Sequence, residues 1–286
     1  MLNDPFVSVI TPCYNGAKYL PKYLESLLQQ DYSHIEFIFV NDGSTDKTEQ
    51  IFFEFKPKLE NKGWKVLYLK QENGGAASAL NTGLKYFTGK YLTWPDSDDI
   101  LFHNYISRKV EYMEEHNDCG LLFSVAEMLD LDNLTDEKKY VKCNKELLNE
   151  SNIFESLMFN KNATIVNLCT FIRSKNFLEV NPKREIYHNG HGQNYQMLLP
   201  VAYNSKIGFI DDVLASYVVH KDSNSNDKNT RYKRFLVYQD VLFKVLDSIE
   251  MPALKRLILK LKTLIYFGKR RAKYKIKNFL NYNKRK

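Results

Sequence analysis

The sequence lacks the features that mark membrane-spanning or secreted proteins. No stretch approaches 18 consecutive apolar residues, so we expect no membrane-spanning helix. The first sixteen residues have neither a basic start nor a long apolar segment, so we expect no secretory leader. The four cysteines, at positions 13, 119, 143 and 169, form no CxxC pair. This scatter predicts reduced thiols and a cytoplasmic protein.

Two nucleotide-binding signatures are also missing. The pattern GxxxxGK[ST] of a phosphate-binding loop does not occur, and no GxGxxG follows the first predicted strand. The chain nevertheless has 286 residues, 44% of them hydrophobic and 14% aromatic, which is enough for a sizeable core. If a nucleotide binds, we expect carboxylates and a metal ion to hold it rather than a glycine-rich cradle.

Positive charge is confined to one end of the chain. Thirteen of the 41 Lys and Arg residues lie in 255–286, which contains no Asp or Glu. Residues 1–254 therefore contain the other 28 basic residues and all 34 acidic residues, so this part of the chain has a net negative charge. The net charge of +7 thus describes the tail and not the folded domain.

Strand-like and helix-like segments alternate along the first hundred residues. Apolar runs predict strands over 6–11, 35–40, 65–69 and 91–94, and apolar residues at helical spacing predict helices over 17–30, about 46–59 and 76–87. Such alternation predicts right-handed crossovers and an α/β fold with a mostly parallel sheet. Further strands are expected over 121–125 and 165–172, with a polar excursion over 130–145.

Three polar loops should meet at one edge of this sheet. They are 12–15, 41–46 and 96–99, and 73–75 should lie beside them, because ligands bind outside the carboxyl ends of parallel strands. Asp96, Asp98 and Asp99 are three carboxylates within four residues, and such oxygens suit Mg²⁺ or Mn²⁺. The alternative is a solvated turn in which Asp99 caps the next helix.

Four motifs in order resemble one known family. They are Val-Ser-Val-Ile-x-Pro-x-Tyr-Asn at 7–15, Val-Asn-Asp-Gly-Ser-x-Asp at 40–46, Asn-Gly-Gly-x-x-x-Ala-x-Asn-x-Gly at 73–83, and Asp-Ser-Asp-Asp at 96–99. This set resembles the family 2 glycosyltransferases, which have the Rossmann-like GT-A fold with a mostly parallel sheet flanked by helices. The resemblance continues more weakly to about residue 225 and does not cover the basic tail.

The resemblance implies roles for individual residues. Pro12, Tyr14 and Asp42 match positions that hold the nucleotide base. Asp96 matches the first Asp of the DxD motif, near the ribose, and Asp98 the second, which ligates the metal on the donor diphosphate. His220 resembles the His of a late His-x-x-Ser-x-Ser motif that can reach the metal; the alternative is a lone imidazole at a strand end. The donor site would also include three further residues, Asn15, Asn73 and Ser97.

The sequence departs from the family where the catalytic base is expected. Gln193-Asn194 stands in place of a Glu-Asp pair, and an amide cannot accept a proton at neutral pH. Three interpretations stay open. Another group (His191, His188 or Asp211) serves as base, or Asn194 only orients the acceptor while the metal and the departing leaving group do most of the work, or the protein is weakly active or inactive. Leu80, where many relatives carry Arg, and Trp94-Pro95 are smaller departures.

The tail predicts an amphipathic helix. Leu254, Leu257, Ile258, Leu261, Leu264 and Ile265 fall on one helical stripe, with basic residues over much of the remainder. Such a helix can lie on an anionic membrane surface, attracted by about 1 kcal/mol per basic residue. The alternatives are a stripe that packs on the domain and an arm that binds nucleic acid. We favour peripheral membrane association and expect no nucleic acid. A processive polysaccharide synthase is disfavoured, because the chain has no Gln-x-x-Arg-Trp and its only tryptophans are Trp64 and Trp94.

Together these observations predict a nucleotide-sugar-binding half over 1–115, an acceptor-binding half over 116–228 and a helical basic tail over 229–286. The predicted function is transfer of a single sugar from a nucleotide-sugar donor to a glycan or lipid-linked glycan. We expect a UDP-sugar as donor and Mn²⁺ or Mg²⁺ as cofactor, and the resemblance implies inversion at the anomeric carbon. The expected location is the cytoplasm, or the cytoplasmic face of the membrane. Two alternatives are an impaired sugar-nucleotide-binding protein and a sugar nucleotidyltransferase; the latter is disfavoured because no glycine-rich basic loop follows the first strand.

Overall fold

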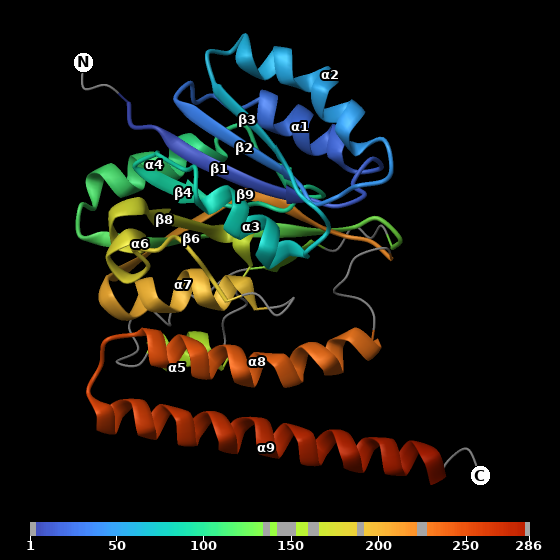
Figure 1. Ribbon diagram of the computed structural model, residues 1–286, viewed down its shortest axis with the longest axis vertical. Coiled ribbons are helices and arrows are strands. Elements are labelled where there is room, and N and C mark those ends of the chain that lie inside the picture. The colour runs from blue at the N-terminus through green and yellow to red at the C-terminus, as the bar shows by residue number, and fades with distance from the viewer. Residues whose placement is uncertain are drawn as a thin grey trace.

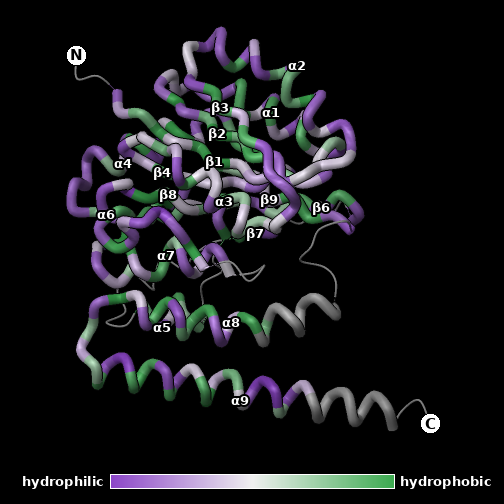
Figure 2. The backbone as a smooth tube through the Cα atoms, in the orientation of Figure 1, coloured by the Kyte–Doolittle hydropathy of each residue, from purple (hydrophilic) through white to green (hydrophobic). Residues whose placement is uncertain are grey.

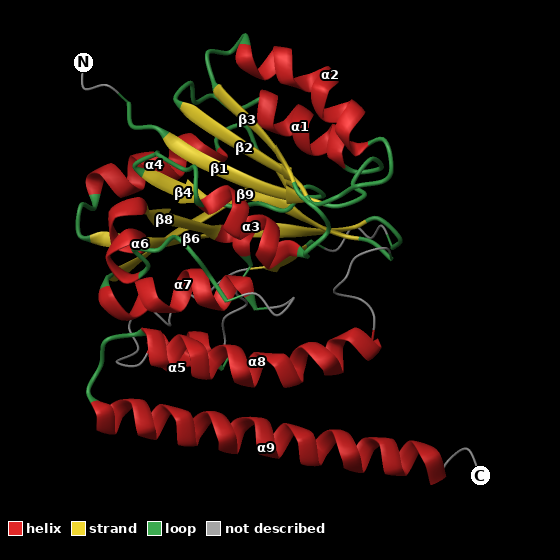
Figure 3. Ribbon diagram, in the orientation of Figure 1, coloured by secondary structure: helices red, strands yellow, loops and turns green. Residues whose placement is uncertain are grey.

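The computed structural model describes residues 4–133, 138–141, 153–159, 166–187, 192–221 and 228–283. Its centre is a mixed sheet in the order β3-β2-β1-β4-β8-β6-β9-β5, with β7 paired to β6 (Figure 3). The strands are β1 (Val7–Cys13), β2 (Ile35–Asn41), β3 (Lys65–Lys70), β4 (Tyr91–Thr93), β5 (Ile100–Leu101), β6 (Cys119–Asp130), β7 (Lys139–Val141), β8 (Thr170–Arg173) and β9 (Lys206–Val219).

Helices cover both faces of this sheet. They are α1 (Leu20–Leu28), α2 (Thr48–Glu60), α3 (Ala76–Leu84), α4 (Tyr105–Glu115), α5 (Ile153–Met158), α6 (Ser174–Val180), α7 (Gln193–Asn204), α8 (Lys228–Ser248) and α9 (Ala253–Asn283). Residues of α1, α2 and α4 share one apolar core, and residues of α3, α6 and α7 share the other. Figure 1 shows α8 beyond α7, and α9 beyond α8 at the edge of the molecule.

The first half of the chain forms the parallel part of the sheet, as the alternation of strands and helices predicts. β3, β2, β1 and β4 are parallel neighbours, and every residue of β2 is buried, which explains its unbroken apolar run. The second half brings antiparallel pairs, since β8 lies antiparallel to both β4 and β6. The α/β class is confirmed, and the parallel order is confined to the first four strands together with the β6–β9 pair.

Several predicted boundaries are wrong for local reasons. The helix expected from 17 begins at Leu20, because the backbone amide of Ala17 donates to Asp46 in the loop after β2 and that of Gly16 donates to Thr48, the first residue of α2. The helix expected to reach 87 ends at Leu84. The predicted polar excursion is partly strand, since β6 continues to Asp130 and pairs with β7.

The strand expected over 165–172 begins only at Thr170. A 3-10 turn, Asn167–Cys169, precedes it, and the Thr170 hydroxyl donates to the Asn167 carbonyl oxygen. This turn places the Asn167 side chain against the strand that leads to the Asp cluster, where its Nδ2 donates to the Trp94 carbonyl oxygen over 2.7 Å.

The described cysteines, at positions 13, 119 and 169, are buried, whereas Cys143 lies outside the described residues. Within the described ranges, no helix has both the length and the apolar character needed to span a bilayer.

Candidate active site

Two loops at the carboxyl edge of the sheet are fastened to each other. Asn15 lies in the loop after β1. Its side-chain Oδ1 accepts a hydrogen bond from the backbone amide of Thr45 over 2.8 Å, and its backbone amide donates to Ser44 Oγ over 3.0 Å. Asn15 has a φ of +49°, so this exchange holds it in the left-handed region. Asp46 Oδ2 accepts from the Ala17 amide over 3.0 Å. Burial acts to raise the pKa of Asp46, but hydrogen bonds from the Thr48 side chain and from the Ala17 and Thr48 amides keep it below its ordinary value.

Asp42 fastens the third loop. Its Oδ1 accepts from Gln71 Nε2 over 2.7 Å and from the Gly74 amide over 2.9 Å, and its Oδ2 accepts from the Gly75 amide over 2.8 Å. The residue is only 2% exposed. Gly43 beside it has a φ of +74°, and a Cβ there would lie 2.7 Å from the backbone nitrogen of Asn73. The Asn-Asp-Gly sequence therefore lets the loop after β2 approach 73–75 closely.

The Asp cluster follows β4, which ends at Thr93 before Pro95. One carboxylate oxygen from each of Asp96, Asp98 and Asp99 lies within 4.8 Å of the others. Burial, with the Asp98 charge as a smaller cause, raises the pKa of Asp96 to about 7, against a lowering by the Asn167 hydrogen bond. Burial first, and then the two neighbouring carboxylates, raise the pKa of Asp99 well above its ordinary value. These three groups repel one another unless a cation joins them.

One buried oxygen of this cluster has no hydrogen-bond partner among the residues that the structure describes. Asp99 is 1% exposed, and its Oδ1 accepts from the Val218 amide over 3.1 Å. Its Oδ2 is buried and accepts no hydrogen bond from any described residue. A buried carboxylate oxygen left in this way is costly. The chemistry of the three side chains fits a hard divalent cation with oxygen ligands.

His220 joins the cluster from the far end of the sequence. β9 pairs antiparallel with β5 directly after the cluster, which carries the end of β9 to the same edge. His220 Nε2 lies 3.0 Å from Asp98 Oδ2, and the ring is stacked on Tyr19 with 4.0 Å between centroids. The structure therefore brings together the side chains of Asp98 and His220, the two residues that the sequence suggests as metal ligands.

Asn194 also lies at this edge. It is the second residue of α7, and its Oδ1 accepts from Trp94 Nε1 over 3.0 Å. This bond explains why the unusual Trp94 stands two residues before the Asp cluster. Asp211 lies seven residues before Val218, whose amide donates to Asp99, and this is about 23 Å along β9 at roughly 3.3 Å per residue. We therefore drop Asp211 as a base.

The other predicted residues are placed as follows. Pro12 is half-buried in β1, whereas Tyr14 is 52% exposed. Ser97 hydrogen-bonds the Cys13 thiol, which joins the loops after β1 and β4. Asn73 is exposed beside Gly43. His188 and His191 lie outside the described residues. Leu80 is buried in the core, so it does not face the site.

Sequence reasoning missed the residues that support these groups. Tyr19, Gln71 and Asn167 each touch a predicted site residue, yet none of them belongs to a motif. Their contacts depend on loops and a turn that come from distant parts of the chain. Only Trp94 gave a signal, as an unusual residue before the cluster.

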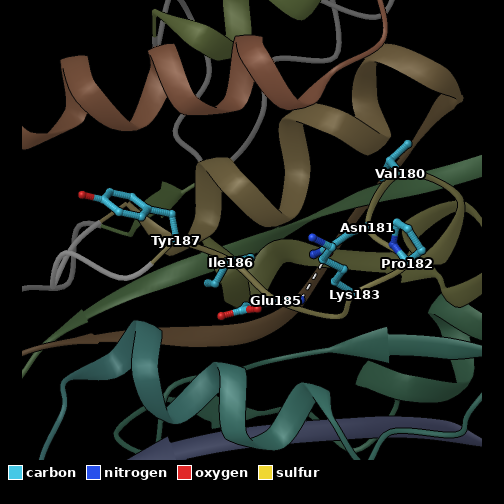
Figure 4. Close-up of a pocket in the computed structure, with 7 residues that line it drawn as sticks. All are labelled: Val180, Asn181, Pro182, Lys183, Glu185, Ile186 and Tyr187. Carbon is cyan, nitrogen blue, oxygen red and sulfur yellow. Dashed lines mark hydrogen bonds between the residues drawn. The ribbon is translucent and has the colours of Figure 1, made fainter.

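A separate pocket lies on the segment that leads toward α7. Its lining is Val180, Asn181, Pro182, Lys183, Glu185, Ile186 and Tyr187 (Figure 4). Two amide side chains hold this segment: Asn81 bonds both backbone groups of Ile186, and Gln196 bonds both of Tyr187. No residue of the Asp cluster lines the pocket, so we do not assign the donor to it.

Comparison with known proteins decides the family. Residues 8–178 match the family described as Glycosyl transferase family 2. The chain belongs to this family. An uncharacterized glycosyltransferase of Rickettsia typhi is 29% identical over 253 residues, which are 88% of this chain and 76% of the relative. The minor teichoic acid biosynthesis protein GgaB of Bacillus subtilis is 39% identical over 111 residues, 38% of this chain and 12% of that protein. In several other curated relatives this family 2 chain covers only 16% to 40% of the relative's length.

Two solved structures resemble the family 2 chain across most of its length. TarS 1-349 of S. aureus in complex with UDP-GlcNAc has a TM-score of 0.65 at 22% identity, covering 91% of this chain and 72% of that one. The mannosyltransferase PcManGT of Pyrobaculum calidifontis, in complex with GDP-Man and Mn²⁺, has a TM-score of 0.63 at 18% identity, and the match covers 92% of this chain and 70% of the mannosyltransferase chain. At these identities the likeness shows the fold, which is the GT-A fold.

Proposed function

We propose that the chain transfers a single sugar from a UDP-linked donor to a glycan or lipid-linked glycan acceptor, with inversion at the anomeric carbon. The observation that carries the proposal is the Asp cluster, whose buried Asp99 Oδ2 lacks a partner among the described residues, at the edge where the loops after β1, β2 and β4 meet. A GT-A neighbour with UDP-GlcNAc bound supports the donor class. The name of GgaB supports a role in a cell-surface polysaccharide or glycoconjugate.

Asp98 and His220 are the proposed ligands of a divalent cation, Mn²⁺ or Mg²⁺. The pairing of their side chains over 3.0 Å and the raised pKa of Asp96 and Asp99 support a site that needs positive charge. Mn²⁺ in the mannosyltransferase neighbour supports the same class of ion. The cation would act as a Lewis acid that offsets the charge gathering on the diphosphate leaving group.

The donor would lie across the fastened loops. We assign Pro12, Tyr14 and Asp42 to the nucleotide base and Asp96 to the ribose. The exposed Tyr14 ring is free to stack on a base, whereas Asp42 is occupied by three hydrogen bonds. Asp42 would therefore act chiefly by shaping the loop 73–75 around the base. Asn15, Asn73 and Ser97 complete the proposed donor site, the first by holding its two loops together.

Asn194 would orient the acceptor hydroxyl. Its amide oxygen is engaged by Trp94 Nε1, which leaves the Nδ2 hydrogens to donate to an acceptor oxygen. An acceptor hydroxyl is a poor nucleophile, so a base is still needed for an in-line attack that inverts the anomeric carbon. We assign the role of the base that takes this proton to His191, with His188 as the second candidate.

We propose that residues 1–115 bind the donor, that residues 116–228 bind the acceptor, and that residues 229–286 form the tail.

A lipid-linked acceptor would bring the chain to a membrane, and we propose the cytoplasmic face as its place of work. The competing function is that of a sugar-nucleotide-binding protein without turnover, since the amide at position 194 cannot take a proton.

Release of UDP from UDP-GlcNAc, UDP-glucose and UDP-galactose, with Mn²⁺ or with a chelator, tests the proposed activity. We expect slow release from one of the three donors, lost with chelator and in Asp98→Asn. Release that persists in the presence of chelator would contradict the role of the cation. Tight UDP binding without release from any donor or transfer to any acceptor would favour the binding protein.

A further inference from the structure

α9 has one face turned toward the rest of the protein and one turned away from it. Leu259, Thr263 and Phe267 are at most 3% exposed and recur every four residues, so they form the inner face. Phe267 stacks on Phe235 of α8 with 4.7 Å between ring centroids, and Tyr266 Oη donates to the Phe159 carbonyl oxygen. These contacts fix the rotation of α9 about its own axis.

The predicted apolar stripe lies on the other face. We define the outer stripe as six residues whose exposed fractions run from 43% to 70%: Leu254, Leu257, Ile258, Leu261, Leu264 and Ile265. The alternative in which this stripe packs on the domain does not hold, because the inner face makes that contact and the stripe is exposed. Figure 1 shows α9 with α8 on one side only, and Figure 2 shows apolar residues recurring along it. Contiguous apolar patches of this kind mark interaction sites.

The charge around the outer stripe identifies what it meets. Successive residues of an α-helix are rotated by about 100° about its axis, and this rotation places four exposed lysines along one side of the stripe. They are Lys255, Lys262, Lys269 and Lys273. Lys262 is also paired with Glu155 of α5. The whole of 255–286 contains no acidic residue. A second copy of α9 against the stripe would therefore bring like charges together, which is unfavourable. Nucleic acid would match the charge but not the six aliphatic side chains.

We propose that the outer stripe docks on a membrane surface that contains anionic lipid. The six side chains would enter the boundary between headgroups and acyl chains, while Lys269 and Lys273 beside them contact lipid phosphates. The helix would lie in the plane of the surface and not cross it. This surface does not depend on the proposed sugar transfer, although it would hold the enzyme where a lipid-linked acceptor is found.

Flotation with vesicles tests the proposal on the full chain. The wild type should float with vesicles of phosphatidylcholine and phosphatidylglycerol. We expect the triple variant Leu257→Gln, Leu261→Gln, Ile265→Gln to partition at least about 30-fold more weakly, because three half-exposed aliphatic side chains are removed. The matched control is Phe53→Gln with Tyr86→Gln, which are similarly exposed at 47% and 49% but lie on α2 and just after α3; its binding should equal that of the wild type.

Charge is tested separately. Lys269→Gln with Lys273→Gln should weaken binding to the anionic vesicles and leave any binding to pure phosphatidylcholine unchanged, and added salt should mimic this variant. Absence of wild-type flotation, or equal flotation of the triple variant, would overturn the proposal. A dimer in sedimentation that the triple variant abolishes, without vesicle binding, would assign the stripe to a second copy. The triple variant should bind UDP as the wild type does. The test of membrane docking and the test of the donor site can therefore fail independently, the first in vesicle flotation and the second in UDP binding.

Discussion

The change Asn194→Asp restores the carboxylate that the family pattern predicts at the start of α7, and its effect on stability follows from one contact. Trp94 Nε1 donates to Asn194 Oδ1 over 3.0 Å, and a carboxylate oxygen accepts the same bond. The N-terminus of a helix favours a negative charge by about 0.3–1 kcal/mol, whereas repulsion from the Asp cluster acts in the opposite direction. We therefore expect the free energy of unfolding to change by less than about 1 kcal/mol, measured by urea denaturation.

The effect on turnover should be larger. The change replaces the amide Nδ2, which we assign to the acceptor hydroxyl, by an oxygen that cannot donate. The acceptor oxygen gains negative charge as it loses its proton during the attack, and a hydrogen bond to a charged group contributes about 1.5–3 kcal/mol, so kcat/KM should fall by about 10-fold to 100-fold. The assay is transfer from the UDP-sugar that the wild type uses, with its KM for the donor unchanged. Gln193→Glu is the control, because it adds the same charge one residue earlier, away from the bond to Trp94.

A faster enzyme would refute this reasoning. A positioned general base accelerates a reaction by about 100-fold or more, so a gain of that size in the turnover of Asn194→Asp would identify the new carboxylate as a base. Asn194 would then be the remnant of a lost base, and the wild type a binding protein with residual activity.

Three further predictions concern stability and the donor loops. Burial lowers the pKa of Lys109 well below its ordinary value, so the unfolded state binds more protons than the folded state. The free energy of unfolding should therefore rise with pH up to about 10, the ordinary pKa of lysine. Urea denaturation at pH 7 and pH 9 should show a smaller rise for Lys109→Met than for the wild type. Gly83→Ala should lower the free energy of unfolding by about 1–3 kcal/mol, because the new Cβ would lie 2.4 Å from Ile10 Cγ2, whereas Gly268→Ala, with nothing within 4 Å, should stabilise the helix by up to about 1 kcal/mol. Asp42→Asn should weaken UDP binding about 10-fold or more in calorimetry, because an amide cannot accept all three of the hydrogen bonds that hold the loop 73–75; equal affinity would contradict its role.

The local patterns in the sequence predicted the parallel half of the fold well. The apolar run of β2 and the polar residues that follow β1, β2 and β4 were sufficient to place three loops at one edge, because these features are determined by neighbours in sequence. The same holds for the amphipathic pattern of α9.

The missed features depend on contacts between distant segments. β8 follows a 3-10 turn at 167–169 and pairs antiparallel with β4 and β6, and no local pattern in the sequence predicts either the turn or the direction of the strand. The bond between Trp94 and Asn194 joins residues one hundred positions apart. The direction of the outer stripe was also undecided, since an amphipathic pattern defines a stripe without saying which face meets the domain.

The measurement that tests the central claim most directly is calorimetric binding of UDP with Mn²⁺, with Mg²⁺ and with chelator, for the wild type, Asp98→Asn and Asp211→Asn. Asp211 is exposed and distant from the cluster, so its variant is the control for the change in charge. We predict metal-dependent binding by the wild type and by Asp211→Asn, and affinity at least about 30-fold weaker in Asp98→Asn, since a carboxylate ligand would be lost. Binding that is indifferent to metal and to Asp98, or no binding of UDP at all, would contradict a donor site at the Asp cluster.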